Sequence, residues 1–163
     1  MPEIIVRRAS EGDLERMRAI WREAADQYAT LDPRYKVAPD GEAQWETALR
    51  SWLVRADTAV LVGVIEGKPL GYLVGMVEHG RPGFLPERYG YVSELAVDFH
   101  TKQGGMGRAL LKAFKGWLAE QGIAHLEARV PLAQPIAQAF WRALGAGKVY
   151  DQMWLPVGSS VGE

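Results

Sequence analysis

Apolar residues recur along the chain with two different periods. In some segments they return every third or fourth position, which predicts amphipathic helices, and in others they form short β-branched runs, which predict strands. The segments follow one another without an internal repeat or a linker. The predicted order is a strand over 3–9, a helix after Ser10, a helix after Asp40, strands over 58–67, 69–78 and 91–97, a helix over 105–122, a strand over 123–130, a helix over 133–146, and one or two strands within 148–156.

Capping residues support these boundaries. Ser10 and Asp13 have the spacing of an N-terminal capping box. In that motif, the side chain of each residue accepts a hydrogen bond from the backbone N–H of the other. Pro33 ends the helix that they begin, because proline cannot continue a helical hydrogen-bond ladder. Gly122 is placed to cap the end of a later helix.

Length and charge narrow the class of protein. The 163 residues are predicted to form one α/β (α+β) domain, with residues 157–163 as a frayed tail. The 19 Lys and Arg nearly balance the 20 Asp and Glu and form no basic tract, so no nucleic-acid partner is expected. No apolar run is long enough to span a bilayer, no signal peptide is apparent, and there is no cysteine. We therefore expect a soluble, cytoplasmic protein without a membrane partner.

Three glycines, Gly104, Gly105 and Gly107, separate the strand over 91–97 from the helix that follows it. The first N–H groups of a helix lack intrahelical partners and attract anions, and glycine lets a phosphate approach them closely. Lys102 adds a cation beside this turn. The alternative is that the glycines only form a tight turn. A Walker A loop is excluded because its Lys-Ser/Thr ending is missing, and a dinucleotide-binding fingerprint because its third glycine is missing.

The stretch "YVSELAVDFHTKQGGMGRALL", residues 91–111, resembles the acetyl-CoA-binding motif of the GNAT superfamily of N-acetyltransferases. That motif is a strand ending in Leu-x-Val and a loop, Arg/Gln-x-x-Gly-x-Gly/Ala, that opens a helix. Lys102 stands where the family usually has Arg or Gln. The resemblance implies that backbone N–H groups of this turn hold the pyrophosphate of acetyl-CoA, the co-substrate. The cofactor-binding residues that it implies here are Leu95, Ala96, Val97, Lys102, Gln103, Gly104, Gly105, Met106, Gly107 and Arg108.

A second segment, "AQPIAQAFWRALGA" over 133–146, is similar to the family's other CoA-contacting segment, Asn-x-x-Ala-x-x-Phe-Tyr-x-x-x-Gly-Phe. The resemblance adds Gln134, Phe140 and Trp141 to the cofactor-binding residues. Gln134 replaces the Asn and keeps its amide group. Trp141 replaces a Tyr that is often assigned as the general acid, and an indole N–H cannot serve that role.

The resemblance covers nearly the whole chain and implies a fold. That fold is a mixed, mostly antiparallel central sheet of six to seven strands, flanked by about four helices, with a splayed strand pair that holds the CoA arm. Because GNAT proteins are often homodimers, the resemblance also implies a homodimer.

Acyl transfer from a thioester to an amine needs a base, an oxyanion donor, and a proton or a positive field for the departing thiolate. Glu94 is the candidate base, acting directly or through water. The alternative is a carboxylate that only binds a neighbouring backbone group or arginine. By resemblance, a backbone N–H near Ala96 or Val97 is the oxyanion donor. Tyr150 is the candidate proton donor in place of Trp141.

Other polar side chains carry weaker signals. Tyr72, Tyr89 and Tyr91 are lesser candidates for the proton donor and fit core or rim positions better. The three histidines show no metal-ligand spacing, so no metal is expected.

The function that these observations predict is an N-acetyltransferase. It moves the acetyl group of acetyl-CoA to a primary amine of a small molecule or peptide, by direct attack in a ternary complex. The alternative is a non-catalytic acyl-CoA-binding or sensing module of the same fold, which Trp141 favours because it removes the usual proton donor. Small-molecule amines, amino acids, aminoglycosides and peptide N-termini all stay open as acceptors.

Overall fold

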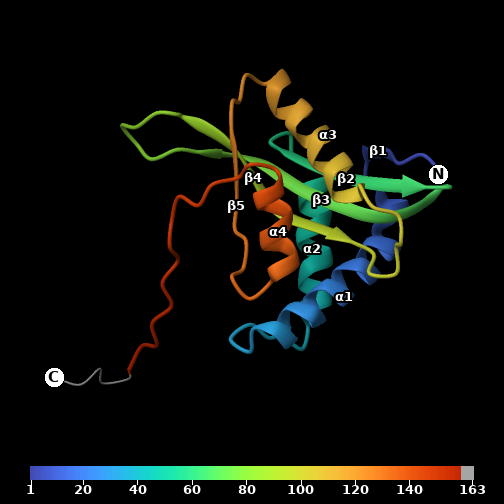
Figure 1. The fold of residues 1–163 in the computed structure, drawn as a ribbon, viewed down its shortest axis with the longest axis horizontal. Helices are drawn as coiled ribbons and strands as arrows, with labels where there is room; N and C mark the ends of the chain where they lie inside the picture. Colours follow the sequence, from blue (N-terminus) through green and yellow to red (C-terminus); the bar gives the residue numbers. More distant parts are fainter. Residues whose placement is uncertain (159–163) are drawn as a thin grey trace. The chain divides into compact units, whose positions relative to one another are not determined.

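The computed structural model describes residues 1–158 (Figure 1). The described residues divide into two compact units, one over Met1–Arg129 and a second that begins at Val130. We describe each unit by itself, and that the two units act as one domain stays a prediction. The first unit holds β1 (Ile5–Arg8), a 3-10 turn (Glu11–Asp13), α1 (Leu14–Leu31), α2 (Gly41–Leu53), β2 (Thr58–Ile65), β3 (Lys68–His79), β4 (Arg88–Val97), α3 (Met106–Glu120) and β5 (Leu126–Ala128), and the second holds α4 (Pro135–Ala143).

The sheet of the first unit has the order β1-β2-β3-β4-β5. The first three pairings are antiparallel and the pairing of β4 with β5 is parallel, which confirms the mixed, mostly antiparallel sheet. β5 pairs only with Gly90, Tyr91 and Val92, whereas β4 runs on to Val97. The pairing of these two strands therefore ends after three residue pairs, which a splayed strand pair also requires.

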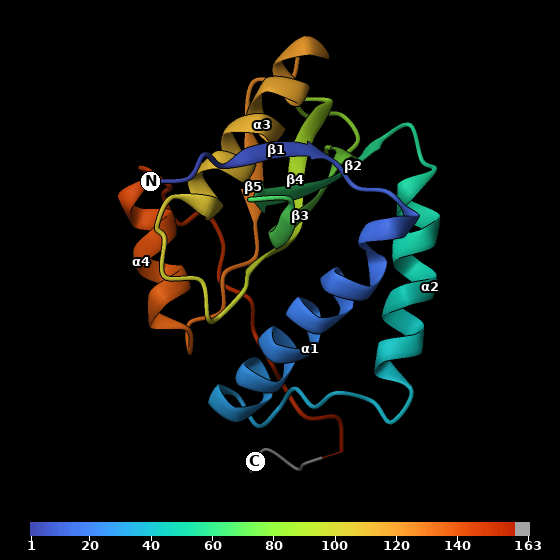
Figure 2. The same cartoon turned by 90° about the vertical axis from the view of Figure 1, so that its right-hand side faces the viewer.

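The two faces of the sheet carry different helices (Figure 2). On one face, α1 and α2 pack against β2 and β3 through a buried apolar cluster. Periodic apolar positions of the two helices fill it, because an amphipathic helix buries one stripe. The cluster consists of Leu14, Met17, Ile20, Trp45, Leu49, Val60, Val62, Val64, Tyr72 and Val74.

On the other face, α3 packs against strand positions that are glycines. A Cβ built on Gly75 would lie 2.4 Å from the Phe114 ring, and one on Gly90 would lie 2.3 Å from Leu118. Such distances are shorter than real contacts between carbon atoms, so α3 can approach the sheet this closely only over bare backbone. The sequence pattern of the strands did not predict this use of their glycines.

Local signals placed the helix ends correctly. The Ser10 N–H donates to Asp13 Oδ2 at 2.8 Å, as the capping-box spacing predicts. α1 ends at Leu31, two residues before Pro33. Gly122 follows the end of α3 with φ of +73°, the left-handed conformation that a helix end favours.

The strand count was predicted wrongly. The described residues form five strands rather than six to seven, because 148–156 contain no strand. A strand exists only where a second backbone pairs with it. The apolar pattern of 148–156 marked side chains suited to burial but could not identify a pairing partner. Of the predicted frayed tail over 157–163, residues 159–163 lie outside the described residues.

Candidate functional site

A β-bulge in β4 determines where Glu94 points. Glu94 pairs with Val74 and Val92 pairs with Gly75, so Ser93 is an extra residue without an opposite partner. In a regular strand, residues two positions apart lie on the same face. The bulge breaks that rule: Val92 lies with Gly75 on the α3 face, while Glu94 lies with Val74 on the face that α1 and α2 cover.

On that face, two side chains donate hydrogen bonds to the Glu94 carboxylate. Trp45 Nε1 from α2 lies 3.0 Å from Oε2 and 3.2 Å from Oε1, and the Tyr72 hydroxyl from β3 lies 2.8 Å from Oε2. Burial raises the pKa of Glu94 above its ordinary value, and these two hydrogen bonds act against the rise. Burial and the nearby carboxylate raise the pKa of Tyr72 well above its ordinary value, so its hydroxyl keeps its proton.

Beyond the bulge, one edge of β4 has backbone groups that pair with no strand of the first unit. The Asp98 N–H donates to the Leu70 carbonyl of β3 at 2.7 Å. Because backbone groups alternate in direction along an antiparallel strand, the N–H groups of Leu95 and Val97 face away from β3. β5 does not extend past Ala128, which pairs with Val92, so within the first unit no strand pairs with this edge, which we call the open edge. An extended ligand with its own amides could pair there as an added strand.

The glycine turn lies directly after this edge. Gly105 is the N-cap of α3, with φ of +94°, a conformation that residues with a Cβ rarely adopt. No atom lies within 4 Å of where a Gly104 Cβ would be, so packing does not require glycine there. Met106 is buried against the sheet, and only its backbone N–H remains for a ligand. The α3 N-terminus thus combines unpaired N–H groups, a partial positive charge and bare backbone.

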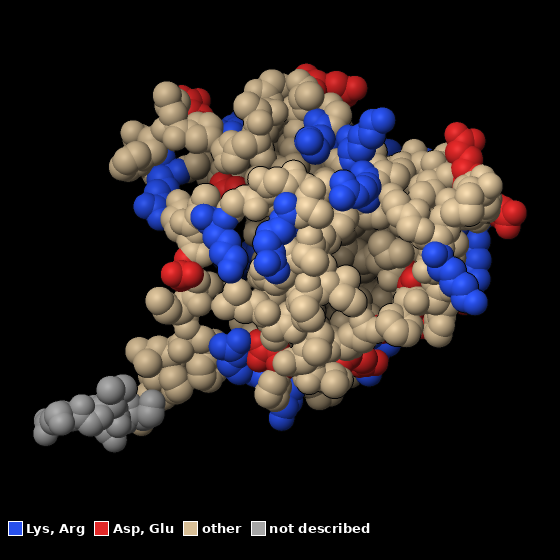
Figure 3. All heavy atoms as spheres, viewed as in Figure 1, with Lys and Arg blue, Asp and Glu red and all other residues tan. Residues whose placement is uncertain are grey.

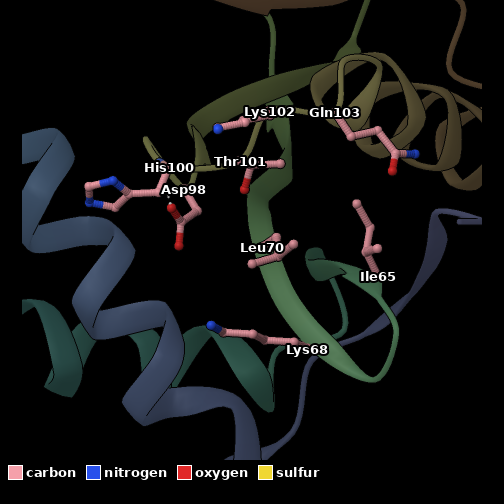
Figure 4. Close-up of a pocket in the computed structure, with 8 residues that line it drawn as sticks. All are labelled: Ile65, Lys68, Leu70, Asp98, His100, Thr101, Lys102 and Gln103. Carbon is pink, nitrogen blue, oxygen red and sulfur yellow. Dashed lines mark hydrogen bonds between the residues drawn. The ribbon is translucent and has the colours of Figure 1, made fainter. Parts of the chain in front are cut away.

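Asp98 holds the loop between β4 and α3. Its carboxylate accepts a hydrogen bond from the His100 N–H at 2.7 Å and forms an ion pair with Arg16 of α1. Lys102 and Gln103 line a pocket of about 290 Å³ between this loop and the turn that joins β2 to β3 (Figure 4). Its other lining residues are Ile65, Lys68, Leu70, Asp98, His100 and Thr101.

The family model for acetyltransferases of the GNAT type matches residues 16–146. The chain belongs to the GNAT acetyltransferase family. Among curated protein sequences, none matches the chain.

Solved structures confirm that the chain has the GNAT fold. The aminoglycoside N-acetyltransferase AAC(6')-Iy in complex with CoA superposes with a TM-score of 0.73 at 16% identity, over 97% of each chain. A mutant of the BH1408 protein from Bacillus halodurans superposes with a TM-score of 0.82 at 21% identity, over 94% of this chain and 99% of that one. An aminoglycoside acetyltransferase from an uncultured soil sample, in complex with sisomicin, gives 0.69 at 20% identity, over 94% and 96%.

The second GNAT segment lies in the second unit. Gln134 is the N-cap residue of α4 and makes no side-chain cap bond, while Phe140 and Trp141 pack edge to face at 5.6 Å. Gln138, which the sequence did not single out, donates to the Val130 carbonyl at 3.0 Å and so ties the preceding loop to the helix. Tyr150 is exposed and lies in no strand, contrary to its predicted place in a late strand.

Of the cofactor-binding residues that the resemblance implies, those of the first unit lie in one continuous segment. Leu95, Ala96 and Val97 end β4, 102–105 form the turn, and 106–108 begin α3. The sequence does not single out Trp45 as a partner of Glu94, because its place on the apolar stripe of a helix is typical of a core residue.

Charge distribution, metal-binding capacity and the length of apolar helices are the other features of the described residues that bear on function. On the face shown in Figure 3, basic and acidic side chains both occur. Over residues 1–158, no cluster of His, Asp and Glu could hold a metal ion. The described helices also include none that is long and apolar enough to cross a membrane.

Proposed function

We propose that the protein is an acetyl-CoA-dependent N-acetyltransferase that acts on a primary amine of a small molecule or peptide. The observation that carries this proposal is the continuity of two binding features. The open edge at Leu95 and Val97 leads within a few residues to the glycine turn at the N-terminus of α3. The edge suits the amides of a pantetheine arm, and the turn suits the pyrophosphate at its end.

In this proposal, acetyl-CoA supplies a thioester whose carbonyl carbon the amine attacks directly in a ternary complex. Glu94 takes the proton that the amine loses as the C–N bond forms and the C–S bond breaks. Its raised pKa suits the role, because a base is most effective when its pKa is near the working pH. The Val97 N–H is the oxyanion donor that we propose, since it points to the open edge.

The departing thiolate needs a proton. The indole of Trp141 cannot supply it, and we propose Tyr150 as the donor. A thiol of this type has a pKa of about 8.5, so the proton that Glu94 has gained is also acidic enough to pass to it through water.

The alternative function is a non-catalytic acyl-CoA-binding module, which Trp141 favours. Measurement of turnover distinguishes the enzyme from the binding module, because a binding module releases no free CoA thiol with any amine. Aminoglycosides are one acceptor class to test, since a structural neighbour was solved with sisomicin. A cytoplasmic location and a homodimer complete the proposal.

Binding can be tested first and separately. At a concentration 100 times its Kd, acetyl-CoA stabilises the folded state by about 2.7 kcal/mol, which corresponds to a rise in Tm of about 5–10 °C. We expect this rise with acetyl-CoA and none with ATP or NAD. Equal rises with all three nucleotides would count against a CoA site.

A further inference from the structure

The Glu94 carboxylate is held asymmetrically by Tyr72 and Trp45. We infer that these two are positioning residues of the acetyl transfer: they hold Oε2 and leave Oε1 as the atom that takes the amine proton. This inference rests on the proposed function, in which Glu94 is the base.

The distances distinguish the two oxygens. Oε2 accepts from the Tyr72 hydroxyl at 2.8 Å and from Trp45 Nε1 at 3.0 Å. Oε1 has only the longer arm of the shared Trp45 contact, at 3.2 Å. A carboxylate oxygen has two lone pairs, so Oε2 is fully used and Oε1 keeps one for a proton.

Both donors are fixed by packing. Tyr72 is 1% exposed and Trp45 is 6% exposed. Trp45 stacks on Trp21 with ring centroids 5.4 Å apart and meets the Tyr72 ring at 6.0 Å. Neither donor can turn away without opening the core, so the carboxylate keeps one orientation through the reaction. Such support from neighbouring side chains is what holds a base within reach of its proton.

Neither donor can reverse its role. An indole N–H only donates, and the raised pKa of Tyr72 keeps its hydroxyl protonated. The two donors therefore stabilise the charged carboxylate, and they stay paired with Oε2 after Oε1 has gained a proton.

The groups that face Glu94 from other elements do not compete with this arrangement. β3 contributes Tyr72 and α2 contributes Trp45, while α1 faces the cluster with the apolar Leu14, Met17 and Ile20. The three cations of α1 are paired with other carboxylates: Arg16 forms an ion pair with Asp98, Arg18 lies 3.0 Å from Glu46, and Arg22 lies 3.2 Å from Asp26.

The arrangement can be measured without turnover. The Trp45 indole N–H resonance, assigned by its loss in Trp45→Phe, should shift with pH as Glu94 titrates. In Tyr72→Phe, which keeps the ring but removes one donor, the midpoint of that shift should rise to higher pH. Tyr91→Phe is the matched control and should leave the midpoint unchanged. Glu94→Gln should abolish the titration.

Kinetics then links the arrangement to the reaction. On the acid limb of the kcat/KM profile, Tyr72→Phe should lower the rate roughly tenfold, because a hydrogen bond to a charged group has been lost. The plateau at higher pH should change much less. Trp45→Phe should move the acid limb in the same direction, which gives a second test if Tyr72→Phe does not fold.

Failure of the proposed function and failure of the positioning role give different experimental results. Absence of turnover in a protein whose Trp45 resonance titrates normally rejects Glu94 as an acetyltransferase base, and with it the proposed function. The positioning role is rejected if the protein turns over, Tyr72→Phe does not move the midpoint of the Trp45 resonance, and neither Tyr72→Phe nor Trp45→Phe moves the acid limb.

Discussion

The bare backbone beneath α3 leads to a sharp prediction about stability. In Gly75→Ala, the new methyl group would lie 2.4, 2.5 and 2.8 Å from three atoms of the Phe114 ring, which is fully buried. Overpacking of this kind costs about 1–3 kcal/mol. The usual gain from replacing a strand glycine by alanine, about 0.5–1 kcal/mol, offsets part of it. We expect a net loss of about 1–2 kcal/mol in the free energy of unfolding.

Gly116→Ala is the matched control. Gly116 lies within α3, and no atom lies within 4 Å of the position that its Cβ would take. The same substitution should therefore stabilise the protein by about 0.5–1 kcal/mol through helix propensity. Urea unfolding followed by circular dichroism measures both changes, and the Tm values should differ by about 4–10 °C.

A double mutant tests the cause of the loss. Phe114→Leu removes the ring atoms that the new methyl group would meet, so the cost of Gly75→Ala should fall in that background. If Gly75→Ala proved as stabilising as Gly116→Ala, α3 would not lie on the sheet as described. The placement of the α3 N-terminus would then lose its support.

The site itself gives three further predictions. Gly104→Ala meets no protein atom, so it should leave stability unchanged and weaken acetyl-CoA binding measured by calorimetry; unchanged affinity would move the phosphate site elsewhere. Gly105→Asp puts an anion and a strained φ at the N-cap, and should abolish the Tm rise with acetyl-CoA while Gly116→Ala keeps it. Glu94 should also make stability depend on pH. Because its folded pKa is raised, the native state holds a proton that the unfolded chain releases above its ordinary pKa of 4.5. The free energy of unfolding of the wild type should therefore fall relative to that of Glu94→Gln as pH rises from 4.5 to the folded pKa. Parallel curves would show that folding does not raise the pKa of Glu94.

The glycine turn and α3 could be predicted from the sequence because their signals are local. The spacing of Gly104, Gly105 and Gly107 and the apolar stripe that follows lie within about twenty residues. The capping residues at Ser10 and Asp13 are local in the same sense. Short-range patterns of this kind determine where an element begins and ends.

The environment of Glu94 could not be predicted in this way. Its face of the sheet depends on a bulge, which exists only relative to the pairing with β3. Its hydrogen-bond donors lie 49 residues away in Trp45 and 22 residues away in Tyr72. The predicted strands within 148–156 failed for a related reason, since apolar spacing does not identify the partner strand.

The most direct test of the central claim is mass spectrometry of the products. The protein would be incubated with acetyl-CoA and a panel of primary amines, and each reaction would be examined for acetylated amine and for free CoA in equal amounts. The account predicts equal formation of both with at least one amine, and a rate much lower in Glu94→Gln although that variant still binds acetyl-CoA. A protein that binds acetyl-CoA but acetylates no amine would contradict it, as would a Glu94→Gln variant with the wild-type rate.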